Sequence, residues 1–253
     1  NLEVWVRRNS REYNMSFRGG ERASKLEKVG TVGKANTGTT LRFWPDPKFF
    51  DTDKFAINEL RHALRAKAVL CPGLHIRFEV EKPEQKHEWH YADGLEQYLV
   101  ESLPGTALLP AEPFSAVLKG QREEAEWAIA WADPDGPAIN ESYVNLIPTA
   151  QGGTHVNGFR TGLTDALRDY CEFRNLLPRG VKLAPDDVWD GLQFVLSVKL
   201  QDPQFSGQTK ERLSSRECAA FVSGAVKDSF SLWLSQNTDA GDQIAERAIL
   251  AAQ

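Results

Sequence analysis

A short polar loop at residues 204–210, with the sequence QFSGQTK, carries the two side chains best suited to bind phosphate. Gln208 offers an amide donor and Lys210 a compact positive charge. Two positions apart on an extended loop, these side chains would point the same way and could bind the oxygens of a terminal phosphate. The alternative is a solvated loop with an incidental lysine, and the spacing alone favours that simpler interpretation.

Two turns that contain glycine could also bind ligand groups. In the turn TGT at 37–39, Gly38 permits close backbone approach and the hydroxyls could bond a base or a water, although a simple β-turn is the favoured alternative. The segment GGTH at 152–155 precedes a long helix. It could bind an anion there, or Thr154 could be the N-cap, which the pattern favours. No nucleophile signature accompanies His155, which favours a packed or capping histidine over a catalytic base.

Acidic residues cluster at 123–126 and at 186–190. Flanking turns make solvated faces or helix-start acids the better account of both clusters, so no metal ligand is predicted in this chain. The sequence also lacks a P-loop, a dinucleotide-binding glycine pattern, a zinc-protease motif and a nucleophile elbow.

The composition is that of a globular protein. The 253 residues include 30 Lys+Arg and 35 Asp+Glu, a net charge of −5, with 41% hydrophobic residues. These proportions exclude disordered and collagen-like classes, as well as nucleic-acid binding through bulk charge. Three scattered cysteines, short apolar runs and the lack of a visible leader predict a cytoplasmic protein without membrane contact. Because the sequence begins with Asn1 rather than Met, a fragment or a processed chain is expected.

Periodicity predicts an α+β protein in two parts, 1–103 and 104–253, with the boundary near Pro104-Gly105. The first part should contain a hairpin (2–8 and 12–17), a loop at 33–40, a short strand at 41–44, a helix within 55–70, a second hairpin (75–80 and 85–91) and a short helix at 94–103.

The second part should surround the phosphate-suited loop with a buried strand and a capped helix. Ser214 and Glu217 form a capping-box pattern ahead of that helix. The remaining elements are expected as strands at 114–119, 126–131 and 142–147, a helix from 154 to about 177, a helical turn at 186–190, a buried strand at 192–200, and helices reaching 236 and starting at 238.

Three motifs, taken in order, resemble the ATPase region of the B subunits of bacterial type IIA topoisomerases, which belong to the GHKL ATPases. They are TGTxLRFWP at 37–45, IPxxxGGTH at 147–155 and QTK at 208–210. Residues 172–183 and 202–215 look like the topoisomerase IV branch rather than the gyrase branch. The resemblance covers essentially the whole chain, and the ordered set of motifs is specific.

The resemblance implies that residues 1–103 are the C-terminal part of a GHKL (Bergerat) α/β sandwich and that residues 104–253 are a ribosomal-S5-domain-2-like transducer. The complete B subunit would bind ATP and Mg²⁺, form a homodimer, associate with the A subunit of topoisomerase IV, and pass duplex DNA in decatenation and relaxation. The family's catalytic Glu and Mg²⁺-binding Asn would lie before Asn1, so this chain alone is expected to be inactive.

The resemblance also assigns roles to individual residues. Thr39 matches a threonine that bonds adenine through water, Leu41 an apolar wall of that pocket, and Arg8 an arginine at the pocket mouth. Gln208 and Lys210 match a pair that reaches the γ-phosphate, where Lys210 would neutralise the charge that develops during hydrolysis.

Arg160 matches a basic position that faces DNA on the transducer. Two alternatives remain open. The chain could be a fragment of a gyrase B subunit or another GHKL machine, and supercoiling instead of decatenation would identify gyrase. It could also be a non-catalytic binding module that keeps the fold, in which case nucleotide would have no effect.

Overall fold

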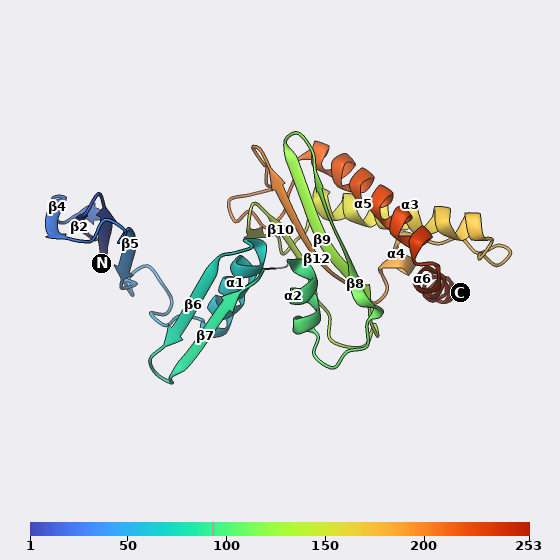
Figure 1. The fold of residues 1–253 in the computed structure, drawn as a ribbon, viewed down its shortest axis with the longest axis horizontal. Coiled ribbons are helices and arrows are strands. Elements are labelled where there is room, and N and C mark those ends of the chain that lie inside the picture. The colour runs from blue at the N-terminus through green and yellow to red at the C-terminus, as the bar shows by residue number, and fades with distance from the viewer. Residues whose placement is uncertain (93) are drawn as a thin grey trace. The chain divides into compact units, whose positions relative to one another are not determined.

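The computed structural model describes residues 1–92 and 94–253, and it confirms the predicted α+β class. The chain forms two compact units, Asn1–His62 and Ala63–Gln253, which are described separately below (Figure 1). This division falls earlier than the expected boundary near Pro104-Gly105, which stays a prediction.

The first unit is a five-stranded antiparallel sheet in the order β3-β2-β1-β5, with β4 paired to β2. Its strands are β1 (Leu2–Arg8), β2 (Arg11–Arg18), β3 (Glu21–Arg22), β4 (Glu27–Thr31) and β5 (Gly38–Phe43). The predicted hairpin is confirmed, and its turn at Asn9 and Ser10 has positive φ at both residues. The predicted loop at 33–40 is too long, because β5 already begins at Gly38. All of residues 1–62 are described, and none of them is buried.

The second unit is built on a sheet in the order β11-β10-β12-β9-β8, in which β10 and β12 run parallel. A separate hairpin, β6-β7, was predicted and is confirmed. The chain from residue 57 onward contains α1 (Ile57–Leu70), β6 (His75–Val80), β7 (Gln85–His90), α2 (Leu95–Ser102), β8 (Leu109–Lys119), β9 (Glu123–Trp131), β10 (Asn140–Val144), β11 (Ile147–Pro148), α3 (Thr154–Arg174), α4 (Pro185–Trp189), β12 (Leu192–Leu200), α5 (Arg216–Gln236) and α6 (Thr238–Ala251).

Strand β12 shows how this sheet is covered on both faces. Alternate residues Phe194, Leu196 and Val198 belong to the core shared with α3 and α5, whereas Val195 belongs to a second core with α1 and α2. Because side chains alternate across a strand, a nearly continuous apolar run is the expected sequence of a strand buried on both sides. The predicted buried strand at 192–200 is therefore confirmed.

Helices α3 and α5 run alongside each other at very close range (Figure 1). A Cβ added at Gly158 of α3 would lie 2.3 Å from the Ala219 carbonyl oxygen of α5, and one at Gly162 would lie 2.6 Å from the Ser223 carbonyl oxygen. The two glycines therefore let the helix backbones approach, which fixes the element that carries residues 154–160.

Two predicted helix ends need correction. Helix α3 ends at Arg174 rather than near 177, because Asn175 adopts the left-handed conformation that terminates helices. The N-cap of α5 is Ser215, not Ser214, and its hydroxyl accepts a hydrogen bond from Gln204 N (2.9 Å) instead of capping the helix.

Candidate functional site

Three predicted site residues share one face of the sheet in the first unit. Thr39 of β5 lies opposite Val6 of β1, and Leu41 lies opposite Val4. Arg8 follows Val6 by two positions on β1, so strand alternation directs it to the same face. Thr39 and Arg8 are exposed, and Leu41 is 62% exposed.

The apolar residues of that face continue across β1, β2 and β5. Phe43 lies opposite Leu2, and Met15 lies opposite Val4. The opposite face carries Trp5 together with polar contacts: Arg7 Nη1 donates to Thr40 Oγ1 (3.3 Å) and lies 3.5 Å from Glu12 Oε1. One face therefore offers a hydroxyl and an arginine beside an apolar surface, which suits the flat, mostly apolar ring of a nucleobase.

The second predicted group lies on a hairpin-like loop that we call the finger, residues 204–214. Its stem is closed by a bridge between Phe205 and Leu213 and by a hydrogen bond from Ser206 N to Arg212 O (2.9 Å). Leu213 is buried, and Phe205 packs partly against the same helix-covered core. The core of the second unit therefore anchors the finger at its base.

The tip of the finger carries Gln208 and Lys210, both exposed. The predicted extended backbone is wrong here. Lys210 N donates to Gly207 O (3.4 Å) across a turn, and Lys210 has a φ of 58°. The expectation that both side chains point the same way because of extended geometry is therefore lost. Lys210 Nζ lies 5.9 Å from the ring centroid of Phe205, and it has no ion-pair partner among the described residues.

The GGTH segment contacts the finger. Leu213 N donates to Gly152 O (3.0 Å), and Thr154 N donates to Leu213 O (3.1 Å). The predicted N-cap at Thr154 is wrong, since Gly153 is the capping residue and the Thr154 hydroxyl is buried without a partner in the described parts of the chain. The Thr154 N–H that an anion would use is already bonded, so the anion interpretation loses this donor.

His155 is a packed residue, as the sequence favoured. It is fully buried, and its Nε2 lies 3.0 Å from Thr149 Oγ1. Burial lowers the pKa of His155 to about 4, so the ring is neutral at physiological pH. The histidine supports the loop beneath the finger and has no exposed reactive atom.

Arg160, the predicted DNA-facing residue, lies on α3 and is engaged within the second unit. Its guanidinium is ion-paired with Asp186 and lies 5.3 Å from the ring centroid of Trp189, both at α4. Its side chain remains 35% exposed. A role toward DNA would therefore compete with these contacts, and it stays a prediction.

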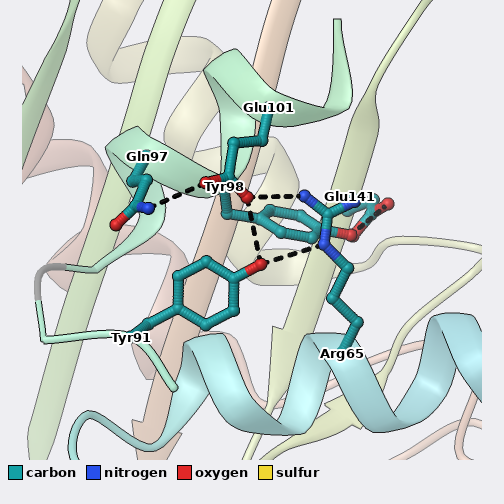
Figure 2. Close-up of polar contacts among 6 residues, drawn as sticks. All are labelled: Arg65, Tyr91, Gln97, Tyr98, Glu101 and Glu141. Carbon is teal, nitrogen blue, oxygen red and sulfur yellow. Dashed lines mark hydrogen bonds and ion pairs between the residues drawn. The ribbon is translucent and has the colours of Figure 1, made fainter. Parts of the chain in front are cut away.

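A polar network joins α1, α2 and β10 within the second unit (Figure 2). Arg65 donates to Tyr91 Oη and to Glu101 Oε2, each at 3.0 Å, and Tyr98 Oη donates to both Glu141 oxygens (3.0 and 2.9 Å). Burial, followed by the Glu141 charge, raises the pKa of Tyr98. The network bonds α2, which precedes residue 103, to β10, which follows it, so these elements form one body.

Comparison with known proteins identifies the family. A family model described as DNA gyrase B matches residues 94–253, and the chain belongs to that family. The sequence is 60% identical to the B subunit of DNA topoisomerase 4 from Pseudomonas aeruginosa, over 98% of this chain and 39% of that protein. The predicted resemblance to topoisomerase IV B subunits is thus confirmed, and the chain spans about two fifths of the length of the curated relatives it matches.

Solved structures agree with the sequence comparison and confirm the predicted fold. The ATP binding domain of topoisomerase IV from Francisella tularensis, solved with a small-molecule inhibitor, aligns with a TM-score of 0.84 and 40% identity, over 100% of this chain and 68% of that one. The 43K ATPase domain of Thermus thermophilus gyrase B, solved with an aminocoumarin, gives 0.79 and 30% identity over the same shares. Among residues 1–92 and 94–253, no helix is both long and apolar enough to cross a bilayer.

Proposed function

We propose that this chain is part of the ATPase region of a topoisomerase IV B subunit, an ATP-dependent DNA isomerase when complete. The observation that carries the proposal is the exposed Lys210, which has no ion-pair partner within the described ranges. It lies on a finger anchored in the core, in a sequence 60% identical to such a protein. The lower identity of 30% to the gyrase B ATPase domain makes the gyrase alternative the weaker one.

The exposed groups of each unit have the chemistry to contact ATP. Thr39 would bond the adenine through water, Leu41 would line the apolar side of the ring, and Arg8 would lie at the pocket mouth. Gln208 and Lys210 would bind the γ-phosphate. Hydrolysis requires a water to attack that phosphate while charge builds on its oxygens, and Lys210 would offset this charge.

Other parts of the activity depend on chain segments beyond these residues. From the resemblance to topoisomerase IV B subunits, the Mg²⁺-binding Asn and the Glu that activates water are expected before Asn1 in the complete protein. The isolated chain would therefore be inactive. We further propose a cytoplasmic homodimer that acts with the A subunit of topoisomerase IV on duplex DNA, with Arg160 toward the DNA.

The test is ATP hydrolysis by the protein extended to the length of its curated relatives, which we call the extended protein. We expect Lys210→Ala to slow turnover by roughly 10²-fold, as the loss of a preorganised phosphate contact does. Lys182→Ala, which removes another lysine of the second unit, is the matched control and should leave turnover unchanged. Turnover of the Lys210 variant near that of the control would overturn the proposed role.

A further inference from the structure

Gln151, in the loop between β11 and α3, makes three hydrogen bonds to the two residues that follow Lys210. Its backbone N–H donates to Glu211 O (3.0 Å), and its side-chain Nε2 donates to Glu211 Oε2 (2.9 Å). Its carbonyl oxygen accepts from Arg212 Nη1 (3.2 Å). Main chain and side chains on one side of the finger are therefore bonded to a single residue 60 positions away.

The next residues of the same loop extend this contact along the finger. Gly153 forms a parallel bridge with Leu213, and a Cβ at Gly153 would lie 2.3 Å from the Leu213 carbonyl oxygen. Such a clash, at a φ of 133°, excludes any other residue without a backbone shift. Residues 151–154 thus lie along the finger, joined to it by an isolated bridge and by backbone hydrogen bonds, and the GGTH motif serves this contact.

The tip itself is weakly closed. The backbone hydrogen bond across it, from Lys210 N to Gly207 O, is 3.4 Å long, beyond the usual range for N–H···O bonds. Lys210 also holds a positive φ, which costs free energy in a residue with a side chain. The position of Lys210 therefore depends on how firmly Glu211 and Arg212 are held.

We propose that Gln151 is a positioning residue, which holds the tip of the finger so that Lys210 and Gln208 are preorganised for the γ-phosphate. The inference rests on the proposed function of Lys210. The contact of Gln151 with Glu211 and Arg212, which we call the clamp, can be measured without nucleotide. A preorganised contact is worth more than a mobile one because no ordering cost is incurred during the reaction.

The hydrogen bond between the Gln151 and Glu211 side chains can be tested by changing the charge of each partner. Gln151→Glu places a carboxylate against Glu211 and replaces a hydrogen bond by repulsion. Adding Glu211→Gln in the double variant restores an amide and a carboxylate, with donor and acceptor exchanged. Gln121→Glu, the same change at an exposed turn between β8 and β9, is the matched control.

Hydrogen exchange of the 253-residue chain measures directly how well the backbone amides of the clamp are protected. In Gln151→Glu we expect the amides of residues 151 and 213, which bond across the clamp, to exchange about tenfold faster, and in the double variant to return to within about threefold of wild type. Protection that is unchanged in Gln151→Glu, or not rescued in the double variant, would overturn the clamp.

ATP hydrolysis by the extended protein then tests the positioning role. We expect Gln151→Glu to lower kcat about tenfold with little change in KM. In a Lys210→Ala background its effect should be clearly smaller, because residues that act through one another are not additive and only Gln208 remains to be positioned. Effects that multiply would overturn positioning through Lys210. If Lys210→Ala alone has no effect, the proposed function fails, whereas the exchange result still decides the clamp.

Discussion

The sheets of the two units differ in how they are covered. In the first unit, no residue of the five strands is buried, and Thr39 and Leu41 project from an open face. In the second unit, β12 has a packed core on each face, and the finger is attached to one of them through Leu213. An apolar sheet face is stable only when another layer covers it. We conclude that packing anchors the base of the finger that carries the phosphate-suited residues, whereas the base-suited residues lie on an exposed sheet face.

In the proposed function, each unit contacts a different end of the nucleotide. A nucleobase is flat and mostly apolar, so a broad sheet face with one hydroxyl can bind it. A terminal phosphate needs a charge at a defined position, and a short loop on a rigid base provides one. The units thus differ in whether a packed core lies beneath the residues assigned to the ligand.

Matched leucine truncations test most directly whether one sheet is covered and the other is open. Leu196 of β12 is 0% exposed and Leu41 of β5 is 62% exposed. We expect Leu196→Ala to destabilise the second unit by about 3 to 4 kcal/mol and Leu41→Ala to cost less than about 0.5 kcal/mol. Native-state hydrogen exchange reads β12 and β5 separately. Equal costs at the two positions would show that the first sheet is covered after all.

Acid titration sharpens the comparison, because the fully buried His155 lies in the covered unit. The pKa of His155 falls from 6.5 to about 4 on folding, so the unfolded chain binds the proton more tightly. The neutral His155 contributes fully to the free energy of unfolding above pH 6.5. This contribution is lost as pH falls toward 4, a loss of about 3 kcal/mol. Urea unfolding at several pH values should show this slope in wild type and a shallower one in His155→Gln. Parallel slopes would contradict the buried neutral state.

A smaller effect is expected where α3 meets α5. Gly158→Ala would force a methyl group against the Ala219 carbonyl, and we expect a cost of about 2 kcal/mol. Gly224 of α5 has no described atom within 4 Å of an added Cβ, so Gly224→Ala should stabilise the helix by about 1 kcal/mol. Urea denaturation of both variants measures the two signs. A stabilising Gly158→Ala would mean that the helices are farther apart.

Much of the fold could be predicted because local patterns determine it. Three elements with clear turn or periodicity signals are found where the sequence predicts them. They are the hairpin at Asn9-Ser10, the alternating strands β6 and β7, and the apolar strand β12. Strands β3 and β4 were missed because they are short and largely polar. The end of α3 was misplaced because Asn175, not the later proline, adopts the terminating conformation.

The site was predicted less completely than the fold. Residue types alone pointed to Gln208 and Lys210, but the turn at the tip replaces the extended backbone that was expected. The contacts of Gln151 and Gly153 with the finger join residues about 60 positions apart, so no periodic pattern records them. The only sequence signal was the paired glycine of the GGTH motif, which indicates close backbone approach without naming the partner.

Nucleotide binding to the extended protein, measured for ADP and for a non-hydrolysable ATP analogue, tests this division of roles most directly. We expect Thr39→Val to weaken both ligands alike, by about tenfold for one lost hydrogen bond, because both carry adenine. Lys210→Ala should weaken the analogue by a similar factor and leave ADP unchanged, because only the analogue has a γ-phosphate. Equal loss of both ligands in Lys210→Ala, or selective loss of the analogue in Thr39→Val, would contradict the assignment of the two groups of residues to opposite ends of the nucleotide.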